Sequence, residues 1–441
     1  MEPKGQLTLE KKYSSCFVFK PQKMSMLLIY IVFSIFTFAL SDKTLIMIDE
    51  IIGLFLVFNI ARFSYFTVLT FLNVFTLFQE FYLDVFGITT GMLKTGKEAP
   101  NAFFELSICT SIFIIIELFF LCSTNMLAVE KSLYRKELFD TKWSVIFRIV
   151  SFFLTLLIFP TIPTFKTNVG HRFDSGILPF SGFAGLTFFL LAISFNNQIK
   201  KKYYLFDFFS VFWFIGHAER IEAMGYLCYV LLRYLNKNDT SNLSIWKIIK
   251  KFYKLILIVL GSLIFLVWIG LTRGGGENNF KITFLIERLF IQSTACDVAY
   301  VFNCTVDLAK NKGLLFGKTY LGHISNLIPF IPNNFDISEV IMKNYYTVGG
   351  CPFFGECVAN FGIVGVAPLM MMYFYLNSFF LKKDSKFRFL FWVPISMMSF
   401  RTAWYGWTSW YTLSFVVAPI IYIIYKCILK KIILPNIILK N

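Results

Sequence analysis

Apolar runs alternate with short polar segments along almost the whole chain. A membrane-spanning helix needs about 20 apolar residues, and roughly twelve runs of that kind can be recognised. The pattern therefore predicts an all-α polytopic membrane protein with about 12 transmembrane helices. We expect about nine spans within residues 24–271 and about three within 360–425, with residues 1–23 and 426–441 as polar tails.

One long stretch, residues 272–359, breaks this alternation. It mixes charges, amides, glycines, prolines and aromatic residues, which predicts a folded unit outside the bilayer between the ninth and tenth spans. Within it, residues 281–310 place apolar side chains at helical spacing, which favours an amphipathic helix of several turns. Pro329 and Pro332 exclude a long helix in the segment that follows, and residues 333–352 indicate a short helix and a loop.

Composition and charge agree with this class. Apolar residues make up 57% of the chain and charged residues 15%, which excludes an ordinary soluble protein. The net charge of +16 comes largely from lysines and arginines in short loops. If the N-terminus is cytoplasmic, nearly all these loops fall on the cytoplasmic side, so the positive-inside rule explains the charge better than nucleic-acid binding does.

The first span, residues 24–40, follows a basic tail without a cleavage site and indicates a retained signal anchor. The second carries Asp49 and Glu50, which are costly in lipid and are therefore expected near a helix end or facing protein. The sequence shows no internal repeat, which disfavours a transporter built from repeats. It also lacks a P-loop and a dinucleotide-binding glycine motif.

Several arginines fall on the predicted non-cytoplasmic side of the membrane, which we call the outward side, although the positive-inside rule predicts few cations there. These are Arg172, Arg220, Arg273, Arg288 and Arg401. The planar guanidinium group binds phosphate and pyrophosphate in a bidentate manner, so the set suggests a lipid-linked phosphate or an acidic glycan as ligand. The alternative is that each arginine pairs with a nearby carboxylate or extends to the membrane interface.

Candidates for proton transfer lie on the same side. Glu356 stands at a loop-to-helix junction, where it could act as a general base or simply as an acid favoured by the helix dipole. His171, His217 and His323 are the three histidines of the chain, and each is either catalytic or structural. Tyr320 belongs to a group of outward aromatic residues that could stack on sugar rings or form an interfacial belt.

Metal and redox chemistry have no motif in this chain. There is no HExxH, DxD or CxxC sequence, so neither a metal nor a cofactor is predicted. Four cysteines, Cys296, Cys304, Cys351 and Cys357, lie in the long stretch. They could form a disulfide if the stretch faces an oxidising compartment, and their spacing leaves this open.

Four segments together resemble a known family. They are HRFDSGILPFSGFAGL before a span, RIEAMG in a short turn, LTRGGG followed by GKTYLGHISNLIPFIP in the long stretch, and FGECVANFGIVG entering the next span. With the span pattern, they are similar to the Wzy-type O-antigen polymerases of bacterial envelopes. The resemblance implies a GT-C-like membrane glycosyltransferase of the bacterial inner membrane. Both termini would be cytoplasmic, and the active face and large loop would be periplasmic.

The resemblance also implies substrates and residue roles. The enzyme would join undecaprenyl-pyrophosphate-linked oligosaccharide repeat units within the membrane lipid, without nucleotide sugar or metal, and a chain-length-determinant co-polymerase would be its partner. No nucleic acid is involved. By position, Arg172, Arg220 and Arg273 would bind pyrophosphate, and Glu356 would be the base. The full expectation assigns catalysis to Glu356, Arg273 and Arg220, and substrate binding to Arg172, Arg288, His323, Tyr320 and Arg401.

Three other interpretations remain. An O-antigen ligase shares the lipid donor and relies on a loop histidine, for which His323 could be offered, although GHISNLIPF does not resemble the ligase motif. A lipid-linked glycan flippase or secondary transporter fits the number of spans but not the single long loop. A purely structural subunit gives no reason for the outward arginines.

Overall fold

A computed structural model describes most of the chain, and every regular element in the described residues is helical. The described residues are 21–163, 176–217, 219–238, 245–272, 282–327, 337–347, 350–382, 385–406 and 410–427. The expectation of an all-α membrane protein is confirmed at this level.

Seven of the described helices are long and apolar enough to cross a membrane. They are α2 (Pro21–Leu40), α3 (Lys43–Ala61), α4 (Tyr65–Phe86), α6 (Phe103–Ser123), α8 (Thr141–Ile158), α12 (Ile245–Thr272) and α18 (Val366–Phe380), the last extended by the short helix η2 (Ile363–Gly365).

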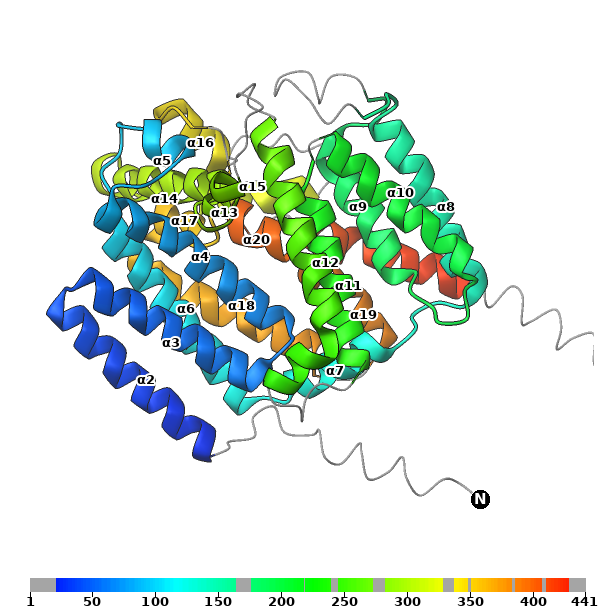
Figure 1. Ribbon diagram of the computed structural model, residues 1–441, viewed down its shortest axis with the longest axis horizontal. Coiled ribbons are helices and arrows are strands. Elements are labelled where there is room, and N and C mark those ends of the chain that lie inside the picture. Colours follow the sequence, from blue (N-terminus) through cyan, green and yellow to red (C-terminus); the bar gives the residue numbers. More distant parts are fainter. Residues whose placement is uncertain are drawn as a thin grey trace, which may run out of the picture.

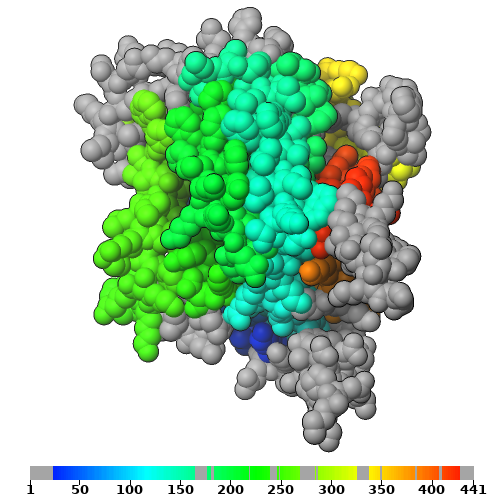
Figure 2. Space-filling model, turned by 90° about the vertical axis from the view of Figure 1, so that its right-hand side faces the viewer, coloured from blue at the N-terminus to red at the C-terminus, as the bar shows by residue number. Residues whose placement is uncertain are grey.

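Shorter helices lie in the rest of the bundle. They are α9 (Phe180–Ile193), α10 (Tyr204–Gly216) after the single turn η1 (Lys201–Tyr203), α11 (Ile221–Lys237), α19 (Lys386–Met397), α20 (Ser399–Tyr405) and a helix over Thr412–Cys427 that begins with the π-helical segment η4 (Thr412–Val417). One of them, α20, lies largely in the segment predicted to join the last two spans. Figure 2 shows part of this bundle from the side, with α8, α10 and α12 forming much of the visible face.

Small helices gather at one end of the bundle. They are α5 (Gly91–Thr95), α13 (Ile282–Phe290), α14 (Ser293–Asn311), α15 (Lys318–Leu327), α16 (Ile337–Asn344) and α17 (Gly355–Phe361). Figure 1 places α7 (Met126–Arg135) at the opposite end. The described part of the long stretch thus forms a helical layer over one end of the long helices.

The long stretch is more helical than its sequence indicated. Residues 281–310 were expected to form one helix, but α13 and α14 are separate. The Gln292 side chain accepts a hydrogen bond from the Ala295 amide at 2.6 Å and caps α14. The predicted irregular segment contains α15, and Pro329 and Pro332 follow its end, outside the described residues. The short helix expected within residues 333–352 is confirmed as α16.

The start of the predicted tenth span is also corrected. Glu356 was expected to lead directly into this span, but it lies in α17, which is a separate helix of 7 residues. Gly362 ends α17 with φ +71°, a conformation that glycine adopts at little cost. The chain then turns before α18. Glu356 therefore lies on a short helix of the end layer.

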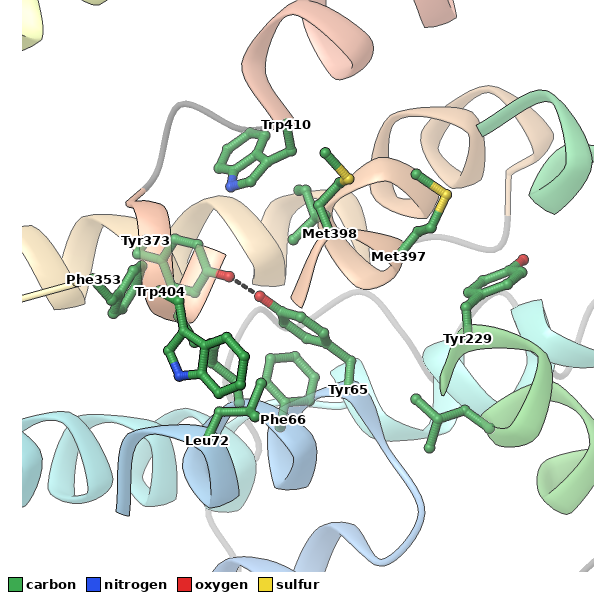
Figure 3. Close-up of a cluster of buried hydrophobic side chains, with 14 of the residues drawn as sticks. Tyr65, Phe66, Leu72, Tyr229, Phe353, Tyr373, Met397, Met398, Trp404 and Trp410 are labelled. Atoms are coloured by element: carbon green, nitrogen blue, oxygen red, sulfur yellow. Dashed lines mark hydrogen bonds between the residues drawn. The ribbon is translucent and has the colours of Figure 1, made fainter. Parts of the chain in front are cut away.

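Buried aromatic side chains join the two halves of the sequence. The hydroxyls of Tyr65 on α4 and Tyr373 on α18 form a hydrogen bond, which Figure 3 shows between neighbouring rings. The indole nitrogen of Trp404 on α20 donates to Thr76 on α4 at 3.2 Å. Because Trp404 also lies in this cluster, α20 is fixed against α4 and can position the residues that follow it.

A buried ion pair holds α8 and α10 together. Arg148 is fully buried, and its Nε and Nη2 atoms donate to the two carboxylate oxygens of Asp207 at 2.8 and 3.3 Å. Its Nη1 atom donates to the Ser194 carbonyl at 2.6 Å, and the Tyr226 hydroxyl donates to Asp207 at 2.8 Å. Each nitrogen of the guanidinium group and each carboxylate oxygen of the pair therefore has a hydrogen-bond partner inside the bundle.

Replacing Arg148 with leucine is expected to destabilise the folded protein by about 3–5 kcal/mol, because it leaves the Asp207 charge buried without a partner. The double variant Arg148→Leu, Asp207→Leu should recover much of this loss. Thermal unfolding in detergent, followed by size-exclusion chromatography, would measure both. A single variant that unfolds at the temperature of the parent would contradict this account.

Candidate functional site

A histidine and a glutamate meet in the helical layer. His323 lies on α15 and Glu356 on α17, and their side chains are 5% and 1% exposed. The Glu356 Oε1 atom lies 2.7 Å from His323 Nε2 and accepts a hydrogen bond from the Thr319 hydroxyl, also at 2.7 Å. Two residues separated by 33 positions therefore form one buried polar site.

Helical spacing explains how the site is assembled. Thr319 and His323 are four residues apart on α15, and Glu356 and Asn360 are four apart on α17, so each pair shares a helix face. The Asn360 amide donates to the Thr319 hydroxyl at 2.7 Å and to the Glu356 carbonyl at 2.8 Å. Its oxygen accepts from the Gly317 amide at 2.9 Å. Asn360 thus fixes the start of α15 against α17.

The contact with Glu356 determines which histidine nitrogen is free. An ionised carboxylate only accepts hydrogen bonds, so His323 Nε2 carries the hydrogen and Nδ1 has the lone pair. Nδ1 is buried and has no hydrogen-bond partner among the residues that the structure describes. A carboxylate that orients an imidazole in this way prepares the other nitrogen to take up a proton. The arrangement suits general-base chemistry.

The end of α20 reaches the same carboxylate. Gly406 follows α20 with φ +86°, and a Cβ atom there would lie 3.5 Å from Glu356 Oε2. On the same short helix, Arg401 donates from Nε and Nη2 to Glu222 Oε1 of α11, each at 2.6 Å. Its guanidinium group also lies over the Tyr405 ring, 5.1 Å from the centroid. One helix therefore connects the His323–Glu356 pair to an arginine–glutamate pair.

The predicted arginines have different environments. Arg220 precedes α11, and its Nη1 atom donates to the Leu266 carbonyl of α12 at 2.8 Å. Arg288 on α13 lies over the Phe284 ring, 4.8 Å from its centroid. Arg401 pairs with a nearby carboxylate, which was one of the two interpretations. Arg172 and Arg273 lie outside the described residues.

His217 is not brought to this site. His217 Nδ1 lies 2.8 Å from the Trp213 carbonyl and Nε2 3.3 Å from the Thr161 hydroxyl, and the ring stacks on Phe159. These contacts give His217 a structural role at the end of α10. His171 lies outside the described residues.

An apolar pocket of about 440 Å³ lies beside α15, the helix that carries His323, although neither His323 nor Glu356 lines it. Tyr320 lines it, stacks on Phe361, and donates from its hydroxyl to Cys357 Sγ at 3.4 Å. Tyr411, from the C-terminal part of the chain, also lines the pocket and interacts electrostatically with Glu356. The complete lining is Phe316, Gly317, Tyr320, Leu321, Ile324, Phe361, Leu369, Met372 and Tyr411. Tyr320, predicted to bind substrate, is thus in contact with both a pocket and the site.

A second apolar pocket, of about 470 Å³, lies between α11 and α12. We call it the α11–α12 groove; its lining includes Leu227, Leu231, Val259, Leu263, Leu266 and Phe400. Leu266 accepts the hydrogen bond from Arg220, and Phe400 is next to Arg401 in the chain. One end of an apolar groove therefore lies at two arginines.

No protein-family model, curated protein or solved structure matches this chain. The chemistry therefore has to be argued from the site itself. Within the described ranges, no three histidine, cysteine or acidic side chains are grouped to hold a metal ion. What the site offers is an oriented imidazole, a buried carboxylate, arginines and apolar pockets.

Two partners of Glu356, Thr319 and Asn360, were not predicted from the sequence, and neither was the approach of Gly406. The spacing Thr-x-x-x-His in GKTYLGHI and Glu-x-x-x-Asn in FGECVANF would have indicated paired polar faces if both segments had been recognised as helices. The α15 segment was instead interpreted as irregular. The contact with Gly406 is non-local and leaves no comparable signal.

The four cysteines of the long stretch are buried free thiols. Burial raises the pKa of Cys296 to about 11 and that of Cys304 to about 12. The reactive thiolate is therefore scarce near neutral pH, and the sulfur atoms are shielded. The disulfide left open by the sequence is absent from the described residues.

We expect N-ethylmaleimide to leave Cys296, Cys304, Cys351 and Cys357 unmodified in the folded protein, and to modify all of them after denaturation without reductant. Cys427 is exposed and serves as an internal control that reacts in both states. Peptide mass spectrometry would measure the modification. Two thiols that stay unmodified after denaturation would instead reveal a disulfide.

Proposed function

We propose that this protein is an O-antigen polymerase, a membrane glycosyltransferase that joins undecaprenyl-pyrophosphate-linked oligosaccharide repeat units at the periplasmic face of the bacterial inner membrane. The observation that carries the proposal is the buried His323–Glu356 pair. This pair lies in the helical layer that the long stretch forms over one end of the bundle. In this proposal the chain crosses the membrane about 12 times, the shorter helices included, with both termini in the cytoplasm.

The proposed reaction is a displacement at an anomeric carbon. A hydroxyl oxygen of the new lipid-linked unit attacks the sugar that joins the growing chain to its lipid pyrophosphate. The new glycosidic bond forms as the bond to the pyrophosphate oxygen breaks, and the undecaprenyl pyrophosphate leaves with the electron pair. The hydroxyl proton moves to His323 Nδ1. Glu356 acts as a positioning residue because it holds the imidazole through Nε2.

Arginines supply the positive charge for the departing group. Developing charge on a pyrophosphate is stabilised by guanidinium groups placed beside it. Arg220 and Arg401 lie at the end of the α11–α12 groove, and Arg172 and Arg273 join them in this proposal by their place in the outer segments. Arg288 and Tyr320 are proposed to contact the glycan.

The α11–α12 groove is proposed to hold the polyprenyl chain, since it is apolar and lies between helices at the edge of the bundle. Its volume of about 470 Å³ accommodates part of such a chain. Ser262 is its small polar lining residue, at a position where α12 faces α11.

Filling the groove with the variant Ser262→Trp is expected to reduce polymer at least tenfold, because a bulky side chain occupies the space of the lipid. The matched control is Ser262→Ala, which leaves the space open and should keep parental polymer. Both are measured as lipopolysaccharide ladders at equal membrane levels of protein. Equal ladders for the two variants would exclude the groove as the lipid site.

An O-antigen ligase is the second candidate, and the orientation of His323 by Glu356, which leaves one imidazole nitrogen without a hydrogen bond in the described part of the chain, favours it specifically. The decisive experiment is a gel of surface lipopolysaccharide from a strain lacking this protein. Core bearing only a single repeat unit indicates polymerase. Loss of all O-antigen from the core, with long chains left on the lipid carrier, indicates ligase. Repeat units trapped inside the cell indicate a flippase, and an unchanged ladder overturns the whole proposal.

A further inference from the structure

A second polar centre lies deep between α2, α3 and α6, away from the proposed glycosyl-transfer site. Its members are Tyr30, Ser34 and Thr37 on α2, Asp49 and Glu50 on α3, and Ser111 on α6; we call it the α2–α3–α6 oxygen cluster. All six side chains are at most 4% exposed. Asp49 and Glu50 were expected near a helix end or facing protein, and the structure has them facing protein.

Most of these oxygens have no hydrogen bond of normal geometry in the part of the chain that the structure describes. Glu50 Oε1 accepts a hydrogen bond from the Ser111 hydroxyl. Both oxygens of Asp49, the second oxygen of Glu50, and the hydroxyls of Tyr30 and Ser34 are buried without such a bond, and their nearest polar neighbours are other hydroxyls of the cluster. Leaving a buried polar group unpaired costs about 1–3 kcal/mol, and more if it is charged. Such a concentration of unpaired oxygens indicates a ligand that binds to several of them.

The oxygens converge on one place. Tyr30 interacts electrostatically with both carboxylates, and the hydroxyls of Ser34 and Thr37 lie close to the Asp49 carboxylate as potential donors. Gly53 lies one turn beyond Asp49 and Glu50, and a Cβ atom there would come within 2.5 Å of the Tyr30 hydroxyl. The glycine therefore allows the Tyr30 hydroxyl to approach α3 closely and makes the cluster compact.

The charge of the cluster selects the kind of ligand. No lysine or arginine among the described residues forms an ion pair with either carboxylate, and two acids that share a buried site do not both remain ionised. The hydroxyls of Ser34 and Thr37 both lie close to Asp49, whereas Ser111 is the hydroxyl that bonds to Glu50. Because hydroxyl donors stabilise a carboxylate, Asp49 is the better-stabilised anion and Glu50 is the acid that keeps its proton. The result is one negative charge among oxygen ligands, which match a hard cation carrying a single positive charge.

We propose that the α2–α3–α6 oxygen cluster binds a sodium ion, with Asp49 as the charged ligand. The compact arrangement around Gly53 favours sodium over the larger potassium ion. Asp49 lies six residues from the first residue of α3, or about 9 Å along the helix at 1.5 Å per residue, so the ion enters from the end of the bundle that carries α5 and α14 (Figure 1). Bound sodium would hold the peripheral helix α2 to α3 and α6.

The test is thermal unfolding of the purified full-length protein in detergent at constant ionic strength, with sodium chloride replacing choline chloride. Sodium is expected to raise the unfolding midpoint in a saturable manner, and potassium to act at least tenfold more weakly. Asp49→Asn should abolish the response, and Glu50→Gln should keep it because glutamine mimics the neutral carboxyl group. Glu117→Gln, in a buried acid of α6 bonded to Thr70, is the matched control and should also keep it.

Several outcomes would overturn the proposal. Equal effects of sodium and potassium would show a general salt effect, and a midpoint that depends on pH but not on sodium would show a proton site. A sodium response that survives in Asp49→Asn would also exclude it. If Asp49→Asn does not fold, binding of radioactive sodium to the parent and to Ser34→Ala decides, with affinity expected to fall at least tenfold in the variant. None of these measurements depends on polymer formation.

Discussion

Replacing His323 with alanine is expected to reduce O-antigen polymer about 10²–10⁴-fold, the usual range for losing a positioned general base. The protein should remain folded in the membrane, because alanine suits the middle of α15 and removes no charge partner that Glu356 needs to stay buried: Thr319 still donates to it. The measurement is the lipopolysaccharide ladder in a deletion strain complemented with the variant, at matched membrane levels.

Glu356 variants separate the two roles of the pair. Glu356→Gln keeps the size of the side chain but loses its charge, so the imidazole is no longer fixed with its hydrogen on Nε2. A large loss of polymer is expected. Thr319→Val is the comparison, since it removes a second hydrogen bond to the same carboxylate without affecting the histidine contact, and a smaller loss should result. If Glu356→Gln forms normal ladders while His323→Ala does not, Glu356 has no part in orienting the base.

The second large effect concerns Arg401. Its partner Glu222 is 2% exposed, so Arg401→Leu leaves a buried carboxylate unpaired. A loss of about 3–5 kcal/mol in stability is expected, as for other broken buried pairs. Size-exclusion chromatography after graded heating would detect it.

A double variant then distinguishes structure from chemistry at this position. Arg401→Leu combined with Glu222→Leu removes both charges and should restore the folded protein. If Arg401 also binds pyrophosphate, the restored protein forms no polymer. Normal ladders from the double variant would instead mean that Arg401 only neutralises Glu222, and the proposed phosphate role of this arginine would be wrong.

The membrane class and most helices could be predicted because apolar runs and caps are local features. Asp42, Ser64 and Asp140 each accept hydrogen bonds from the first turn of the following helix, a signal that short polar segments show directly. The helices of the long stretch were harder to predict from the sequence. Pro329 and Pro332 led us to exclude a long helix and to expect an irregular segment, in which α15 ends just before them.

The candidate site could be predicted only in part. Glu356, His323, Tyr320 and Arg401 were identified, since each is an unusual residue type for its place in an apolar chain. Their grouping was not, because it depends on how α15, α17 and α20 pack. The sequence favoured Glu356 as the base, whereas the observed contact favours His323 for that role. The assignment of the base depends on how helices from distant segments pack, and the sequence of any one segment does not show this packing.

The Arg148–Asp207 pair also bears on how the protein is made. An arginine or aspartate near the centre of a helix raises the free energy of membrane insertion by about 2.5–3.5 kcal/mol. Arg148 lies near the middle of α8, and its partner is synthesised 59 residues later, on α10. Asp207 lies in the first turn of α10, so α8 is the helix that inserts poorly alone, and its insertion becomes more favourable once Arg148 is paired. During translation, α8 is expected to stay beside the translocon until α10 emerges, so that α8, α9 and α10 enter the bilayer as one unit.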